Sequence, residues 1–254
     1  MLLRHGGPLS LTIRRTIGRR PVSVTTAKRF SSSSSSNSSS QDHGTKEDHG
    51  TKGPLIYPDA PATQHNSLAA FLAHAKRTGL DERSTVFVGT HYEYTVAAVL
   101  SRYGFTLRRV GGVSDHGTDL LGTWTPPTTA QTLRVLVQCK AGAQRVGPNL
   151  VRELEGAFVG APAGWRGEGV LALLVSQRPA TKGVRDSLGR SRWPMGYVCC
   201  TGDGVVRQMV WNRRAEEEGL EGFGVTTRYV EGRGEAELVL LRNGKMLPLL
   251  ETKE

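Results

Sequence analysis

Four polar residues in the middle of the chain have types and spacings that suit phosphodiester chemistry: Glu93, Asp119, Gln138 and Lys140. Gln138 and Lys140 lie two apart in an apolar run, so on a strand they share one face while Cys139 points to the other. Asp119 follows a bend bounded by glycine. A carboxylate, a polar oxygen and a lysine that converge at one point suit a divalent metal and an attacking water. The pattern therefore predicts a nuclease-type site.

The elements that must position these residues follow from the periodicity of the apolar side chains. A helix is expected over residues 67–76, ended by Gly79. A short strand at residues 85–88 is expected next, followed by a second helix that starts near Thr90 and ends at Gly104. The apolar stripe of that second helix is Tyr92, Val96, Val99, Leu100 and Tyr103, and Glu93 lies next to it.

Strands and two further helices are expected after Gly104. The strands are predicted at residues 105–110, 118–124, 133–140, 169–176, 196–201 and 205–211, and the helices at 148–159 and 181–188. A C-terminal hairpin is predicted at residues 225–230 and 237–241, with a tight turn at Asn243-Gly244 after it. Strands mixed with flanking helices predict a three-layer α/β domain with a mixed central sheet.

The positive charge of the chain is concentrated at its N-terminus. The 254 residues carry a net charge of +10, and residues 1–30 hold seven Lys or Arg and no acidic residue, which leaves +3 for the rest. An Arg-rich, hydroxyl-rich, acid-free segment is typical of a mitochondrial presequence. We therefore expect a mitochondrial matrix protein; the alternative for residues 1–30 is a disordered basic arm.

Composition divides the chain into four parts. Residues 1–30 are the expected presequence, and residues 31–64 a disordered linker, because residues 31–40 are serine except for Asn37. The domain is expected at residues 65–212 and a C-terminal extension at 213–254. Three cysteines without disulfide or zinc spacing fit a reduced compartment, and no apolar run approaches the roughly 20 residues that span a bilayer.

Several motifs together resemble a known family. They are Gly89-Thr-His-Tyr-Glu93, Tyr103-Gly-Phe105, Asp115-His-Gly-Thr-Asp119, Val137-Gln-Cys-Lys140 and Val151-Arg-Glu-Leu-Glu-Gly-Ala-Phe158. Their order resembles the core of restriction-endonuclease-like, PD-(D/E)XK folds, and within these the Mrr-type enzymes, which carry Gln in place of an acid before the lysine. With the presequence and Leu120-Leu-Gly-Thr-Trp124, the chain also resembles the fungal required-for-respiratory-growth family, the seventh of its series. The resemblance covers about residues 84–212.

The resemblance implies a role for each site residue. Asp119 would be the central ligand of Mg²⁺ or Mn²⁺, with closure of a turn as its alternative. Gln138 would be a weaker, neutral ligand, and Glu93 would restore charge from the helix, unless it is a plain surface acid. Lys140 would orient or deprotonate the attacking water. Asp115 is either an outer ligand or a turn residue.

The basic residues near these motifs suggest nucleic acid as the partner. Arg108, Arg109, His116 and Lys140 are the candidates for contacts with backbone phosphates, although a loop histidine such as His116 is more often without function. The leading hypothesis is a metal-dependent nuclease-like protein acting on DNA. The alternatives are an inactive nuclease fold that binds nucleic acid or assists mitochondrial gene expression, and a respiratory assembly factor that ignores nucleic acid. The sequence leaves the oligomeric state open.

Overall fold

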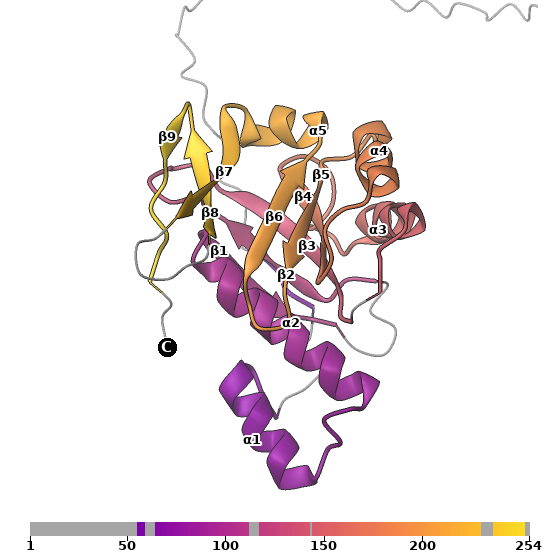
Figure 1. The fold of residues 1–254 in the computed structure, drawn as a ribbon. Coiled ribbons are helices and arrows are strands. Elements are labelled where there is room, and N and C mark those ends of the chain that lie inside the picture. The colour runs from indigo at the N-terminus through magenta and orange to yellow at the C-terminus, as the bar shows by residue number, and fades with distance from the viewer. Residues whose placement is uncertain (1–54, 59–63, 112–116, 143, 230–235, 252–254) are drawn as a thin grey trace, which may run out of the picture. The chain divides into compact units, whose positions relative to one another are not determined.

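Six strands form the central sheet of the protein (Figure 1). The computed structural model describes residues 55–58, 64–111, 117–142, 144–229 and 236–251. The strands are β1 (Phe105–Arg109), β2 (Leu120–Trp124), β3 (Leu133–Lys140), β4 (Val170–Ser176), β5 (Met195–Cys200) and β6 (Val206–Trp211). They lie side by side in chain order; β3, β4 and β5 pair in parallel, and the other pairs are antiparallel. The mixed α/β fold and the six strands predicted between residues 105 and 211 are thus confirmed, with small differences at the strand ends.

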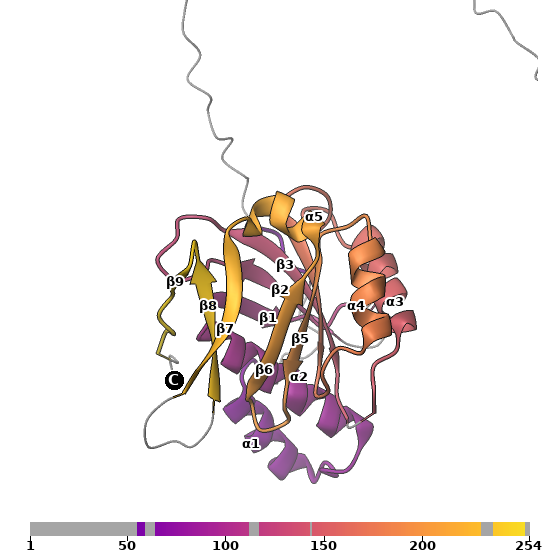
Figure 2. The same cartoon turned by 45° about the horizontal axis from the view of Figure 1, so that its top comes forward.

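Two crossover helices cover one face of this sheet (Figure 2). Parallel strands need such crossovers, and α3 (Pro148–Gly160) joins β3 to β4 while α4 (Lys182–Arg190) joins β4 to β5. In α3, Val151, Leu154 and Phe158 follow helical spacing and are buried against the sheet. Thr181 caps α4, because its hydroxyl accepts a hydrogen bond from the backbone N–H of Val184. The helices predicted in both places are confirmed.

The opposite face carries α2 (Thr85–Ser101), against which α1 (Leu68–Thr78) packs. Ser67 caps α1, and Gly79 ends it in the left-handed conformation (φ 65°) that glycine adopts without strain. The predicted stripe lies in the core shared with β1–β6, with Val99 partly buried and its other members buried. Because that stripe repeats every four residues, one side of the helix faces the sheet throughout.

The strand predicted at residues 85–88 is wrong, because these residues form the first turn of α2. Ser84, not Thr90, is the N-cap: its side chain accepts a hydrogen bond from the Phe87 N–H at 3.2 Å. Val86 is 63% exposed, so this apolar run does not enter the sheet. Phe87 instead packs against Phe71 of α1, with ring centroids 5.3 Å apart. Contact between the helices outweighs the strand preference of β-branched residues.

The C-terminal segment packs on the α2 side of the sheet. A short helix, α5 (Arg213–Ala215), continues into the π-helix η1 (Glu216–Leu220). The second sheet contains β7 (Phe223–Tyr229), β8 (Ala236–Arg242) and β9 (Lys245–Met246), which confirms the predicted hairpin and the turn at Asn243-Gly244. Leu238, Leu240 and Leu247 lie in the same hydrophobic cluster as Tyr92 and Val96 of α2. The segment therefore shares the core of the domain.

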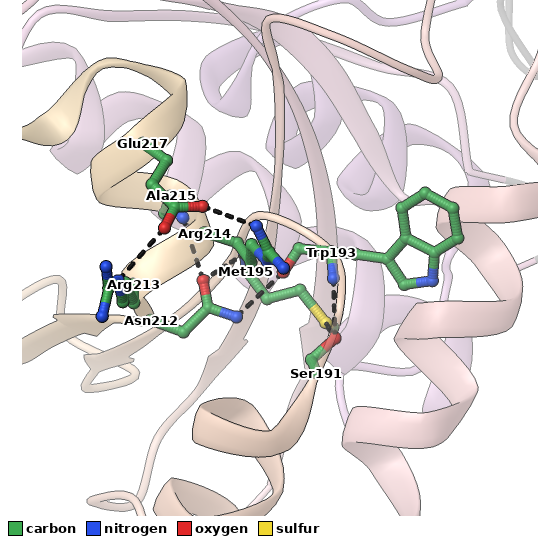
Figure 3. Close-up of polar contacts among 8 residues, drawn as sticks. All are labelled: Ser191, Trp193, Met195, Asn212, Arg213, Arg214, Ala215 and Glu217. Carbon is green, nitrogen blue, oxygen red and sulfur yellow. Dashed lines mark hydrogen bonds and ion pairs between the residues drawn. The ribbon is translucent and has the colours of Figure 1, made fainter.

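Asn212 joins this segment to the main sheet (Figure 3). Its Oδ1 accepts hydrogen bonds from the backbone N–H groups of Met195, at 3.1 Å, and Ala215, at 3.0 Å. Its Nδ2 donates to the carbonyl oxygens of Leu188, at 3.0 Å, and Trp193, at 2.8 Å. One buried amide thus satisfies polar groups at the end of α4, the start of β5 and the first turn of α5.

Some sequence predictions fall outside the described residues. These are the presequence at residues 1–30, most of the linker at 31–64, and the loop residues Asp115 and His116. In the part of the chain that is described, no helix has the length and apolar character that crossing a bilayer requires.

Candidate active site

Asp119 is held where the start of β2 meets the end of β3. Its carbonyl oxygen accepts from the N–H groups of both Val110, at 2.8 Å, and Gly111, at 2.9 Å, while its own N–H donates to Val137 at 3.0 Å. Its carboxylate Oδ2 accepts from the backbone N–H of Cys139 at 2.6 Å. Backbone bonds on both sides, together with this side-chain bond, fix the carboxylate beside the end of β3. A charge-assisted bond of this kind is stronger than a neutral one.

Two glycines make the room that this corner needs. A Cβ atom on Gly111 would stand 3.0 Å from Asp119 Cα and 3.1 Å from its Oδ1, closer than most real contacts. Gly117 has a φ of 80°, and a Cβ there would lie 3.2 Å from Nε2 of Gln138. The two glycines therefore allow the backbone to approach Asp119 and Gln138 closely.

Gln138 and Lys140 share the face of β3 that α3 covers, as their spacing predicts. Both side chains contact Glu153 of α3. Gln138 Nε2 donates a hydrogen bond to Glu153 Oε1 at 3.4 Å, and Lys140 Nζ donates one to the same oxygen at 3.2 Å. Gln138 is only 2% exposed, and its Oε1 is buried with no hydrogen-bond partner among the residues described. A buried acceptor without a partner costs free energy, so a polar partner that reached this oxygen would relieve that cost.

Cys139 lies on the opposite face and packs against the core on the α2 side. Burial raises the pKa of its thiol well above the usual range; the negative charges of Asp119 and then Glu93 raise it further, and Lys140 opposes them. The thiol therefore stays protonated and is no nucleophile at neutral pH. The charges of Asp119, Glu93 and Lys140 all act at this end of the sheet.

Glu93 forms an ion pair with Arg109 of β1. Both side chains are mostly buried, and Arg109 also donates to the Thr90 hydroxyl at 3.4 Å. The positive charge of Arg109 is therefore already balanced inside the protein. A metal ligand role for Glu93 would require its carboxylate to serve both the arginine and the cation.

Arg108 and Arg109 are not brought together, because neighbouring residues of β1 point to opposite faces. The guanidinium of Arg108 lies 4.6 Å from the centre of the Tyr57 ring, and Tyr57 in turn packs against Trp165 at 4.9 Å. Arg108 is nevertheless exposed and thus remains open to an external anion, whereas Arg109 faces α2. His116 lies outside the described residues.

Glu153 lies in the sequence motif Val151–Phe158 but was not predicted as a site residue, yet it contacts both site residues of β3. Its position follows from the crossover, which lays α3 over the face to which Gln138 and Lys140 point. Glu153 lies between Val151 and Leu154, whose burial sets how the helix is turned. The sequence pattern that could have predicted Glu153 is an acidic residue beside the apolar stripe of the helix that follows the strand.

The donor set for a metal is sparse. Within the described stretches, no three His, Cys, Asp or Glu side chains gather closely enough to hold a metal ion. A cation here would depend on the Asp119 carboxylate and the free amide oxygen of Gln138. Both are hard oxygen donors, and Mg²⁺ commonly takes one or two carboxylates and keeps several waters. In chemical type these two oxygens are donors that such a weakly held ion accepts.

Comparison with known proteins identifies the family. The model of the family "Required for respiratory growth protein 7" matches residues 84–132 and 125–229, more than half of the chain. The chain belongs to this family. A mitochondrial protein of Schizosaccharomyces pombe is 34% identical over 155 residues, which span 59% of this chain and 61% of that protein. The mitochondrial "Required for respiratory growth protein 7" of Saccharomyces cerevisiae is 26% identical over 171 residues, 51% of this chain and 71% of that protein.

Both relatives are named as mitochondrial proteins, which confirms the mitochondrial localisation expected from residues 1–30. The family match begins at Ser84, the cap of α2, and ends at Tyr229, the last residue of β7. It therefore includes every candidate residue of the site. No solved structure gives a significant match to the chain.

Proposed function

We propose that this family member is a metal-dependent nuclease-like protein that acts on DNA phosphodiesters in the mitochondrial matrix and is needed for respiratory growth. The observation that supports this most is the free, buried Oε1 of Gln138 at the corner where Asp119 is fixed. Lys140 stands on the same face of β3. The proposal is supported by the placement of all three residues, Asp119 beside the end of β3 and Gln138 and Lys140 in the last residues of that strand, at one end of the sheet.

The proposed core is of the restriction-endonuclease-like, Mrr type. Its support is topological: α2 is followed by three antiparallel strands, a crossover helix and a parallel strand. Asp119 precedes the second strand and Gln138-Cys139-Lys140 ends the third, so antiparallel pairing brings the two motifs side by side. This is the arrangement that the order of the sequence motifs implies.

The side chains divide the proposed chemistry between them. Asp119 and Gln138 would hold Mg²⁺ or Mn²⁺, which when bound supplies Lewis-acid stabilisation of charge developing on the phosphodiester. Lys140 places a positive charge beside that phosphate and orients the attacking water. In the protein without substrate, Lys140 Nζ lies 3.2 Å from Glu153 Oε1. The ammonium of Lys140 must therefore contact both Glu153 and the substrate when it acts on the water. Exposed Arg108 is available to contact a phosphate further along the backbone.

A cleavage assay tests the proposal directly. The full chain is incubated with single-stranded, double-stranded and branched DNA, and with RNA, in the presence of Mg²⁺ or Mn²⁺. We expect Asp119→Asn and Lys140→Met to lower the cleavage rate by roughly 100-fold or more. The matched control is Lys182→Met, because Lys182 of α4 has an 85% exposed side chain and pairs with its helix neighbour Asp186. Cleavage unaffected by both site substitutions would overturn the proposed site.

A second candidate is a protein that binds nucleic acid without cutting it. Two ion pairs favour this candidate, because Lys140 is paired with Glu153 and Glu93 is paired with Arg109. Both proposed catalytic side chains therefore already have a partner of opposite charge. Calorimetry distinguishes the two functions: this candidate predicts DNA affinity that falls with salt and no binding of Mg²⁺ or Mn²⁺. A protein with no salt-dependent DNA or RNA binding at all would point instead to a role in respiratory assembly.

A further inference from the structure

A single oxygen of Glu153 joins the two functional side chains of β3. Gln138 Nε2 lies 3.4 Å from Glu153 Oε1, and Lys140 Nζ lies 3.2 Å from the same atom. Glu153 is half exposed, at 49% for its side chain, whereas Gln138 is 2% exposed. The carboxylate thus sits at the entrance to the buried amide, within reach of solvent and of any ligand that enters.

The contact decides which end of the Gln138 amide faces the helix. An ionised carboxylate only accepts hydrogen bonds, so the NH₂ end of the amide must turn toward it. The other end, Oε1, is then left buried and without a partner. An amide can be turned over at little cost in shape, and the hydrogen bond to Glu153 favours the orientation in which Nε2 faces the helix.

The position of the carboxylate is itself set by packing. Val151 and Leu154, on either side of Glu153, are 1% and 0% exposed, and they fix the rotation of α3 over the sheet. Gln138 is neutral, whereas the common PD-(D/E)XK pattern has an acidic residue at this position. The site therefore carries one negative charge less than that pattern. Glu153 brings a carboxylate back to within hydrogen-bond distance of the same position.

We propose that Glu153 is a positioning residue of the site: its carboxylate orients the Gln138 amide so that Oε1 is presented to a divalent cation, and it holds the Lys140 ammonium at the Nε2 end of the same amide. The inference rests on the proposed function for its metal, but the orientation of the amide belongs to the metal-free protein. Glu153, and not Glu93, is then the acid that compensates for glutamine at position 138.

The test compares Glu153→Gln with the wild-type chain. Glutamine has the same shape but can donate as well as accept, so it no longer selects one orientation of the Gln138 amide. The control is Glu155→Gln, an acid of the same helix that lies two residues beyond Glu153 and therefore points to another side of α3. The Gln138 side-chain NH₂ signals are recorded by NMR and identified by their loss in Gln138→Met. Binding of Mn²⁺ and Mg²⁺ is measured by calorimetry, and thermal unfolding confirms that each variant is folded.

We expect the Gln138 NH₂ signals to shift or split in Glu153→Gln and to stay in place in Glu155→Gln. Affinity for Mn²⁺ should fall by about 10-fold or more, the usual effect of removing a group that orients a metal ligand. The role of Glu153 would be overturned if the NH₂ signals were unchanged in folded Glu153→Gln. It would also be overturned if the wild type bound Mn²⁺ and the variant bound it with equal affinity. Absence of Mn²⁺ and Mg²⁺ binding by the wild type would overturn the metal site of the proposed function instead, and the NMR comparison would still decide whether Glu153 orients the amide.

Discussion

Glu93 of α2 and Arg109 of β1 form an ion pair with side chains that are only 12% and 14% exposed. The pair ties the helix on one face of the sheet to the strand at its edge. It also removes Arg109 from the set of free cations that could meet nucleic acid. Glu93 was a candidate metal ligand and Arg109 a candidate phosphate contact. Each would have to give up part of this ion pair to take that role.

Breaking this pair should destabilise the protein. Arg109→Gln leaves the Glu93 carboxylate without its partner in a mostly buried place, so we expect a loss of about 2 kcal/mol in the free energy of unfolding. Glu93→Gln should cost a similar amount, and the double variant less than the sum of the two. Urea unfolding measures all three proteins. Strict additivity in this double-mutant cycle would show that the two side chains do not interact.

Asn212 should be one of the most sensitive polar positions in the fold. Asn212→Ala removes four hydrogen bonds and leaves the Met195 N–H and the Trp193 carbonyl without their side-chain partner, while the Leu188 carbonyl keeps its bond from the Ser191 N–H. We expect a loss of roughly 2–4 kcal/mol, since each unsatisfied buried group costs about 1–3 kcal/mol. Asn149→Ala, at an exposed position in the first turn of α3, is the control and should change stability little. Equal unfolding midpoints for the two variants would contradict this account of Asn212.

The start of α2 at Thr85 predicts the effect of changing its cap. Ser84→Ala removes the hydroxyl that accepts from Phe87 N–H and should cost about 1 kcal/mol, whereas Ser84→Asp should keep the stability because aspartate also caps helices. Thermal unfolding followed by circular dichroism checks both. If Ser84→Ala were as stable as Ser84→Asp, the helix would not depend on this cap.

Glu237 should make stability depend on acid pH. Burial acts to raise the pKa of this carboxyl, but hydrogen bonds from Arg228 and Arg102 outweigh it and hold the pKa below its usual 4.5. A lowered folded-state pKa contributes stability that is present above 4.5 and is lost as pH falls through the folded value. Glu237→Gln should therefore be less stable than the wild type at pH 7, and the difference should shrink below about pH 4. Urea unfolding across this range measures the effect, with exposed Glu221→Gln as control; a difference independent of pH would argue against it.

The basic N-terminal segment should be needed for import and not for folding. Replacing Arg14, Arg15, Arg19 and Arg20 with glutamine removes four of the seven positive charges in residues 1–30. Because import responds to positive charge on such segments, we expect loss of mitochondrial targeting with unchanged unfolding temperature in vitro. Fluorescence microscopy of a C-terminal fusion reads out the location. Import equal to that of the parent would refute the presequence interpretation.

Local sequence patterns were sufficient for most of the secondary structure. The apolar run that starts at Leu133 predicts β3 with both of its ends, and Gly79 ends α1 as predicted, while Ser67, predicted as the first helical residue, is the N-cap. The alternation of side chains along a strand places Gln138 and Lys140 on one face. These features depend on residues that are only a few positions apart in the chain, so the local sequence is sufficient to predict them.

The partners of the site residues were decided only by the tertiary structure. Residues 85–88 read locally as a strand, but contact between α1 and α2 makes them helical. Glu93 meets Arg109 through the packing of α2 on β1, and Glu153 meets Gln138 and Lys140 because α3 crosses that face of the sheet. Contacts between residues 13 to 16 positions apart in different elements depend on helix rotation and sheet register, which long-range packing of the core sets.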